Sequence, residues 1–286
     1  MKRLFCHIAI VFICLTTSAC MGGKRPRVST NPSSQTIASA PIKVEETVKK
    51  EYEAAPTSRL EIPIVLSTLK EQIISHLGYA VSYNSSHKLP NWVAYELTYD
   101  EVLGTIPRAK KFTQDPNVKG AQADNDDYRN SGWDKGHMCP AGDMKWSKQA
   151  MNESFYFTNI CPQNPNLNGG DWKDLEEKCR DLTRHYGKIY IVCGAIVGRA
   201  ANGTIGYNKV VIPDAFYKVL LVETSRGYES IGFYFENKAG HRNLSYYAKS
   251  VDEIEQLTNI DFFAALTDDV EREVESKYNI SVWQIK

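Results

Sequence analysis

The sequence predicts an α+β fold, and three observations support this. The 286 residues, 42% hydrophobic and 11% aromatic, are enough to bury a sizeable core. Several short apolar runs are rich in β-branched or aromatic residues and are bounded by Gly, Pro, Asn or Asp, which is typical of strands. A few charged segments carry apolar residues at helical spacing. Strands mixed with a small number of helices indicate an α+β domain.

The first twenty residues predict a signal peptide. Lys2 and Arg3 form a positive start, and Leu4 to Leu15 form an apolar run that is too short to span a bilayer. Small residues then lead to Cys20, which resembles the lipidated cysteine of a bacterial lipobox. We therefore expect an exported lipoprotein, anchored to a membrane through Cys20 and facing the periplasm or the cell surface. Ordinary secretion with cleavage near Ala19, or an uncleaved anchor, are the alternatives.

The segment 21–58 predicts a flexible tether, because it is rich in Pro, Ser, Thr, Ala and Lys and poor in large apolar groups. From residue 60 to residue 286 the composition predicts a single globular domain. The expected strands are 79–83, 91–98, 155–158, 188–197, 209–212, 216–222 and 231–235, and the expected helices are 171–186, 251–257 and 268–277.

The charge balance restricts how nucleic acid could be bound. Lys plus Arg number 34 and Asp plus Glu number 34, so loss of Lys2 and Arg3 with the leader leaves 32 basic against 34 acidic residues, a net charge of −2. Proteins that hold nucleic acid through many phosphate contacts usually carry a basic excess. Any basic surface of this protein must therefore be local.

Seven cysteines are present, and Cys6, Cys14 and Cys20 belong to the leader. The remaining four allow three disulfide pairings, among which sequence cannot choose. No CxxC pair occurs and the spacings are wide, so disulfides or buried free thiols are favoured over a zinc site. These four are Cys139, Cys161, Cys179 and Cys193.

Two polar segments, 133–144 and 158–176, contain the residue types that phosphodiester hydrolysis requires. A water must lose a proton, and neutral His is a suitable base because its unperturbed pKa of about 6.5 is close to working pH. Mg²⁺ prefers oxygen ligands and often takes only one or two from the protein. Asn168 and Glu176 are eight residues apart, about 80° around an ideal helix, so both can face one edge if Asn168 precedes the first turn.

The same segments resemble the DNA/RNA non-specific endonuclease family, a branch of the ββα-metal (His-Me finger) nucleases. The stretch 134–137 matches that family's Asp-Arg-Gly-His with Lys135 in place of Arg. The stretches 91–95, 251–255 and 260–263 are also similar, so the resemblance spans roughly residues 79–266. The other matching residues are Arg108, Phe112, Asp115, Pro116, Asn159, Pro162, Gln163, Asn168, Trp172 and Glu176.

The resemblance implies a central antiparallel sheet with flanking helices, and it implies a role for each matching residue. His137 would be the general base that activates water, and Asn159 would orient its ring. Asn168 would bind Mg²⁺ directly and Glu176 would hold the water shell of the metal, with Mn²⁺ as a possible substitute. Arg108 would neutralise the scissile phosphate, and Gln163 would fix the active-site network. Lys135 would contact phosphate as a point charge.

Taken singly, each residue has a structural explanation, such as a turn at 168–170 or surface charge at Arg108. The joint pattern predicts an endonuclease that cuts DNA and RNA with little regard for base sequence and leaves 5′-phosphates. A catalytically silent nucleic-acid-binding lipoprotein and a phosphodiesterase acting on small diesters are the alternatives. We also expect activity to decline below about pH 6 as His137 takes up a proton.

Overall fold

The structure is a computed structural model that describes residues 59–198 and 202–286. The predicted signal peptide, Cys20 and the tether over 21–58 lie outside the described residues. Within the described ranges, no helix combines the length and the apolar character needed to cross a bilayer.

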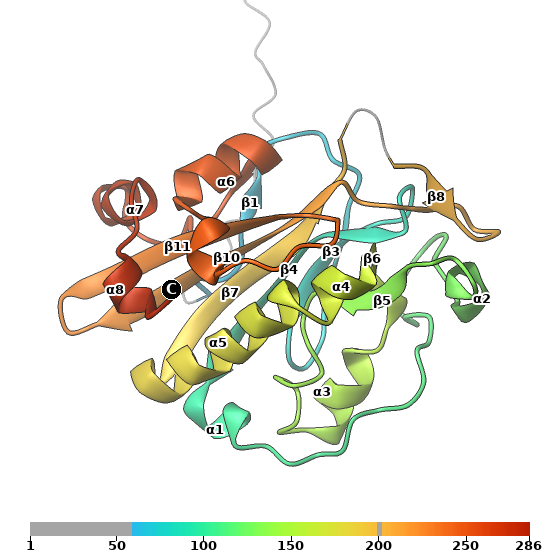
Figure 1. Cartoon of the computed structure of the whole chain (residues 1–286), viewed down its shortest axis with the longest axis horizontal. Coiled ribbons are helices and arrows are strands. Elements are labelled where there is room, and N and C mark those ends of the chain that lie inside the picture. Colours follow the sequence, from blue (N-terminus) through green and yellow to red (C-terminus); the bar gives the residue numbers. More distant parts are fainter. Residues whose placement is uncertain (1–58, 199–201) are drawn as a thin grey trace, which may run out of the picture. The chain divides into compact units, whose positions relative to one another are not determined.

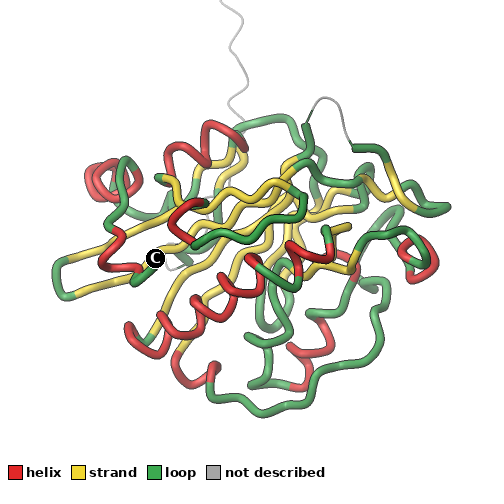
Figure 2. Tube along the Cα trace, in the orientation of Figure 1, coloured by secondary structure: helices red, strands yellow, loops and turns green. Residues whose placement is uncertain are grey.

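A seven-stranded antiparallel sheet forms the centre of the domain (Figures 1 and 2). Its strand order is β12-β11-β10-β7-β4-β3-β2, and every neighbouring pair is antiparallel. The strands are β2 (Gln72–Ser75), β3 (Ala80–Asn84), β4 (Leu89–Thr98), β7 (Lys188–Ile196), β10 (Ala215–Thr224), β11 (Gly227–Glu236) and β12 (Ala248–Lys249). The expected central antiparallel sheet with flanking helices is therefore confirmed.

Alternation along the strands separates two cores on opposite faces of the sheet. On β10, Phe216 and Leu220 belong to the core beneath helix α5 (Asp171–Tyr186). Tyr217 and Val219 belong to the other core, which α6 (Val251–Thr258) and α7 (Asp268–Glu275) cover. Lys218 lies on the α5 side and is fully buried. The domain thus has a helix layer on each face of the sheet (Figure 1).

A small ββα unit lies beside the main sheet. Strands β5 (Asp134–His137) and β6 (Ile160–Gln163) pair antiparallel, and α4 (Pro165–Asn168) and α5 follow directly. The other short elements are β1 (Ile64–Val65), β8 (Thr204–Ile205), β9 (Val210–Val211), β13 (Ile260–Asp261), α1 (Tyr99–Val102), α2 (Asn125–Tyr128), α3 (Lys148–Glu153) and α8 (Ile280–Trp283).

Most expected elements are present, but one strand assignment was wrong. The run 155–158 is not a strand, because Phe157–Asn159 forms a 3₁₀ turn and the strand begins only at Ile160. The aromatic residues there are buried, so their apolar character reflects core packing and gives no information on backbone conformation. The strand at 134–137 was missed, because its sequence Asp-Lys-Gly-His has low intrinsic preference for extended structure.

The four cysteines of the domain are free thiols, and all are buried. This agrees with the second of the two arrangements that the sequence left open. Burial raises the pKa of each thiol, so the neutral form prevails at neutral pH.

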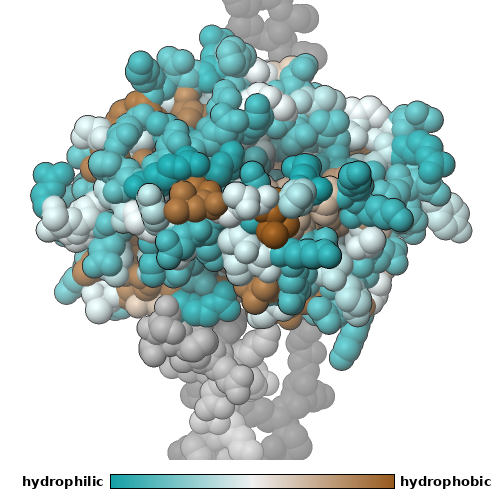
Figure 3. Space-filling view, turned by 90° about the horizontal axis from the view of Figure 1, so that it is seen from below, coloured by the Kyte–Doolittle hydropathy of each residue, from teal (hydrophilic) through white to brown (hydrophobic). Residues whose placement is uncertain are grey.

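The face seen in Figure 3 is mostly hydrophilic where the described residues form it, and its apolar side chains occur in small separate patches. Scattered exposed apolar residues of this kind are normal for a protein surface. They give no indication of a docking surface on that face.

Candidate active site

His137 ends strand β5, and its ring packs against two aromatic side chains that also contact each other. The ring centroid lies 5.4 Å from that of Phe112 and 4.9 Å from that of Phe155. Only 6% of the residue is exposed. The ββ pairing sets its position, since His137 lies opposite Ile160. Phe155 was not recognised from the sequence, where it reads only as a core residue.

Glycine is required immediately before this histidine. A Cβ at Gly136 would lie 2.1 Å from Oε1 and 2.6 Å from Cβ of Gln163 on the paired strand. Gln163 is itself fully buried, and both polar atoms of its amide lack a hydrogen-bond partner in the described structure. Gln163 therefore lies behind the histidine strand, close to Gly136 and outside the cleft that His137 lines.

The imidazole of His137 is held in its neutral form. Burial, followed by the positive charge of Arg108, lowers the pKa of His137 from 6.5 to about 3. The Nε2 atom is buried and has no hydrogen-bond partner among the described residues. In this environment the ring stays neutral well below pH 6, so the pKa of His137 argues against protonation of this ring as the cause of a decline in activity below that pH.

Asn159 does not contact the imidazole with its side-chain amide. Its Oδ1 accepts from the backbone N–H of Cys139 at 2.8 Å, and its Nδ2 donates to the carbonyls of Cys139 and Ser154, each at 2.8 Å. The expectation that Asn159 orients the ring directly is thus not met. The residue instead fixes the backbone that follows His137, and its own carbonyl accepts from the N–H of Met138 at 3.0 Å.

Asn168 ends the short helix α4, just before the first turn of α5, as the sequence argument required. Its Nδ2 donates to Oδ2 of Asp134 at 2.9 Å. This bond fixes the orientation of the amide and leaves Oδ1 without a hydrogen bond in the structure described. The sequence shows Asp134 only as one residue of the 134–137 motif. Its contact with Asn168 gives it the role of orienting that amide.

Glu176 lies two turns into α5 and lines the same cleft as Asn168 and His137. Its carboxylate is half-buried and makes no hydrogen bond or ion pair with any described residue. Burial raises the pKa of Glu176 to about 7, against the opposing effect of the Lys218 ammonium. A carboxylate without a protein partner and an amide oxygen without one, both lining the same cleft, are donors that suit a hard divalent cation.

Trp172 links helix α5 to the strand that carries His137. Its indole Nε1 donates to the carbonyl of His137 at 3.2 Å, and the residue is fully buried. On the other side, the Lys218 ammonium lies 4.5 Å from the centroid of the Trp172 ring. Trp172 therefore packs inside the domain, between the strand of His137 and Lys218.

Four basic side chains line the cleft, which has a volume of about 340 Å³. Arg108 lies on the loop before Phe112, and its guanidinium carbon is 5.1 Å from the centroid of the Phe155 ring. Lys135 donates to Oδ1 of Asn125 at 2.9 Å. Lys173 and Arg180 come from α5, and they complete the local basic surface that the neutral net charge required.

Lys173 and Arg180 were missed in the sequence, although helical spacing could have revealed them. They are three residues before and four residues after Glu176, so they share its face of α5. Arg180 Nη1 also pairs with Oδ1 of the buried Asp143 at 2.8 Å. That ion pair holds the guanidinium at the rim of the cleft.

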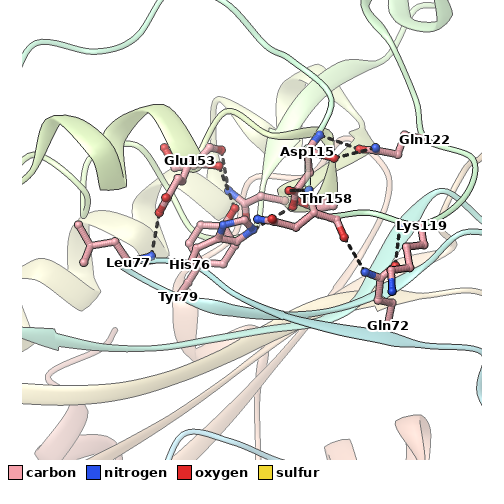
Figure 4. A network of polar contacts seen from close by, with 12 residues as sticks. Gln72, His76, Leu77, Tyr79, Asp115, Lys119, Gln122, Glu153 and Thr158 are labelled. Atoms are coloured by element: carbon pink, nitrogen blue, oxygen red, sulfur yellow. Dashed lines mark hydrogen bonds and ion pairs between the residues drawn. The ribbon is translucent and has the colours of Figure 1, made fainter.

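A buried polar network anchors the loop that carries Arg108 and Phe112 (Figure 4). Nε2 of His76 lies 2.9 Å from Oδ2 of Asp115, and the Thr158 hydroxyl donates to the same oxygen at 2.9 Å. Because Thr158 precedes Asn159, the network joins the loop to the turn behind His137. The bonds to His76 and Thr158 and the N–H of Asn117 lower the pKa of Asp115 despite burial.

Together the fold and the cleft define a class of protein. A neutral imidazole, two oxygen donors that suit a divalent cation and four cations around one cleft on a ββα unit are the elements of a metal-assisted phosphodiesterase site. A family model described as DNA/RNA non-specific endonuclease matches residues 57–269. The chain belongs to this family.

Individual relatives agree with the family assignment. The mitochondrial nuclease EXOG of Xenopus laevis is 34% identical over 211 residues, which cover 68% of this chain and 59% of that protein. Human mitochondrial endonuclease G is 35% identical over 167 residues, covering 54% of this chain and 56% of that protein. The chain thus spans less than two thirds of the length of these relatives.

A solved structure is similar as well. The crystal structure of the EndoG/EndoGI complex, whose title describes the mechanism of EndoG inhibition, superimposes with a TM-score of 0.66 at 27% identity. The similarity covers 70% of this chain and 89% of that chain. Nuclease C1 of Cunninghamella echinulata is a further relative, at 31% identity over 205 residues, 66% of this chain and 81% of that protein.

Proposed function

We propose that this protein is a Mg²⁺-dependent endonuclease that hydrolyses phosphodiester bonds in both DNA and RNA and leaves 5′-phosphates. The observation that carries the proposal is the convergence of His137, Asn168 and Glu176 on one cleft lined by basic side chains. Base sequence has little influence, because Arg and Lys side chains recognise the phosphate backbone.

In this mechanism His137 accepts the proton of the attacking water, since its imidazole is neutral and lies at the wall of the cleft. The backbone bond from Trp172 and the packing of Phe112 and Phe155 hold the ring in place. Asn168 would bind the metal directly and Glu176 would hold its water shell, with Asp134 orienting the Asn168 amide. When bound, Mg²⁺ stabilises negative charge on the phosphate and the leaving oxygen.

Arg108, Lys135, Lys173 and Arg180 hold the polynucleotide backbone. Arg108 is exposed, so its guanidinium is free to approach the scissile phosphate. Lys135 is half-buried and supplies a single point charge, without the paired donors of a guanidinium. Asn159 has an indirect role, because its amide fixes the loop that follows His137.

The test is a plasmid nicking assay with His137→Ala, performed with titrated Mg²⁺ and with chelator. We expect wild type to nick supercoiled DNA and degrade RNA only with metal, and His137→Ala to lose at least 10³-fold in rate. His185→Ala, which alters an exposed histidine on α5, is the matched control and should keep full activity. Undiminished cleavage by His137→Ala would remove the imidazole from the mechanism.

The same preparations distinguish the two alternative functions. A silent nucleic-acid-binding protein would retard DNA in a gel without cutting it. A small-diester phosphodiesterase would hydrolyse bis(p-nitrophenyl) phosphate faster than it degrades polymer. We expect the polymer to be the better substrate, because four basic side chains line the cleft and a polymer offers several phosphates to them.

We further propose that the protein is exported and anchored to a membrane through a lipid on Cys20. The support is the leader sequence, in which small residues precede this cysteine. Metabolic labelling with palmitate in a bacterial host tests the proposal. The label should be lost in Cys20→Ser and kept in Cys14→Ser, and labelling that survives Cys20→Ser would contradict it.

A further inference from the structure

A cluster of carboxylates lies on the face of the sheet opposite to α5. Asp252 and Glu255 come from α6 and Glu275 comes from α7, and one carboxylate oxygen of each lies within 4.8 Å of the others. Asp261, on β13, and Glu271, on α7, add two further acids, and the charge of Asp261 raises the pKa of Glu271 after the effect of burial. The candidate active site lies on the other side of the sheet and is lined by residues of α5.

Glu275 is the buried member of this carboxylate cluster. It is only 3% exposed, and its Oε1 has no hydrogen-bond partner among the described residues. An ionised carboxylate in such a position is costly unless a positive charge or hydrogen-bond donors compensate it. The Glu271 Oε1 is also buried without a partner.

Nearby basic side chains do not compensate the carboxylate cluster, because they pair with other acids. Lys249 pairs with Glu253, Arg272 with Asp269 and Lys277 with Glu273. After burial, the largest effects on the pKa of Glu275 come from neighbouring acids, which raise it further. Among the described residues, the backbone gives the carboxylate cluster one hydrogen bond, in which the N–H of Phe262 donates to Oε1 of Glu255 at 2.8 Å.

We propose that Asp252, Glu255 and Glu275 bind a calcium ion, which fastens α7 to α6. Calcium takes six to eight oxygen ligands at about 2.3–2.6 Å, so oxygens on opposite sides of the ion lie roughly 4.6–5.2 Å apart. Oxygens that all lie within 4.8 Å of one another fit inside such a shell. Magnesium usually takes only one or two carboxylates and keeps its waters, which makes calcium the better match for three.

The consequence is a structural metal site that is separate from catalysis. Helix α7 packs on the sheet with Val274 in the second core, directly before Glu275. Without a cation, like charges at the contact between α6 and α7 repel each other and weaken this packing. Calcium therefore stabilises the domain without taking part in hydrolysis.

Thermal unfolding of the full chain at pH 7.5, after removal of metals with EDTA, tests the proposal. Adding 1 mM Ca²⁺ should raise the Tm of wild type by several degrees, and of Asn168→Ala equally, because that variant lacks the active-site ligand. Glu275→Gln should lose the rise, whereas Glu273→Gln, at an exposed position on the same helix, should keep it. Calorimetric titration of Asn168→Ala with Ca²⁺ should show one site, weakened at least tenfold by adding Glu275→Gln.

A Tm that does not respond to Ca²⁺, or a rise that persists in Glu275→Gln, overturns the proposal. A cluster that stays neutral by keeping protons would give the first result, together with a Tm that falls steadily as the pH rises. If Glu275→Gln does not fold, Asp252→Asn gives the same test at a half-buried position. Glu275→Gln should retain Mg²⁺-dependent nicking at 25 °C, so this test and that of the nuclease function fail independently.

Discussion

Replacing Gly136 by alanine should damage both the stability and the activity of this protein. The glycine lies between Lys135 and His137 on β5 and faces Gln163 of the paired strand. A methyl group there would be 2.1 Å from Oε1, 2.6 Å from Cβ and 2.9 Å from Cδ of Gln163. All three distances are shorter than a van der Waals contact, so the two strands must separate or Gln163 must move.

The loss of stability in Gly136→Ala follows from overpacking between the two paired strands. Extra methyl groups in a well-packed interior cost about 1–3 kcal/mol, and Gln163 is fully buried, so it has little room to move. For a domain of this size each kcal/mol lowers Tm by about 2–4 °C, which predicts a loss of roughly 2–12 °C. A shift of His137 by about 1 Å would lower the cleavage rate on the order of 100-fold.

Thermal unfolding and plasmid nicking measure the two effects. Gly240→Ala is the control, because Gly240 is exposed and a Cβ there meets its nearest atom, the Tyr247 hydroxyl, at 3.1 Å. Gln163→Ala in the Gly136→Ala background removes the closest contact but leaves the one at 2.6 Å, so it should restore part of the stability. A Gly136→Ala protein with unchanged Tm and rate would refute the reasoning.

Three further predictions concern the cleft. Asp134→Asn should raise the Mg²⁺ concentration for half-maximal nicking about 10-fold or more, because the Asn168 amide loses its orienting carboxylate; an unchanged metal titration would contradict this. Lys135→Arg should lower the KM for DNA several-fold, since a guanidinium offers paired donors to a phosphate, and an unchanged KM would show that this position does not contact the backbone. His137 should lower the free energy of unfolding as the pH falls from 6.5 toward 3. In this window the imidazole is protonated in the unfolded chain but stays neutral when it is buried in the folded protein. His137→Gln should therefore lose roughly 2–3 kcal/mol less than wild type between pH 7 and pH 4.5 in denaturant titrations, and equal losses would argue against a buried neutral imidazole.

The residues of the site differ in how far the sequence alone reveals them. His137, Asn168 and Glu176 could be chosen from the sequence, because they stand at positions that match the family motif and their side chains suit metal-assisted hydrolysis. The strand of His137 could not, because the pairing with 160–163 overrides the weak local preference of Asp-Lys-Gly-His. The same limit applies to Asn159, whose amide bonds depend on where the backbone of Cys139 lies.

The sequence by itself determined the α+β class, the family resemblance and the choice of His137, Asn168 and Glu176 as site residues. These depend on periodicity and on motifs, which are properties of neighbouring positions along the chain. Only the tertiary structure decided that His137 is neutral, that Lys218 is buried beneath Trp172 and that carboxylates of α6 and α7 meet at Glu275. Burial and charge at one atom are sums over groups distant in sequence, so they exist only once the chain has folded.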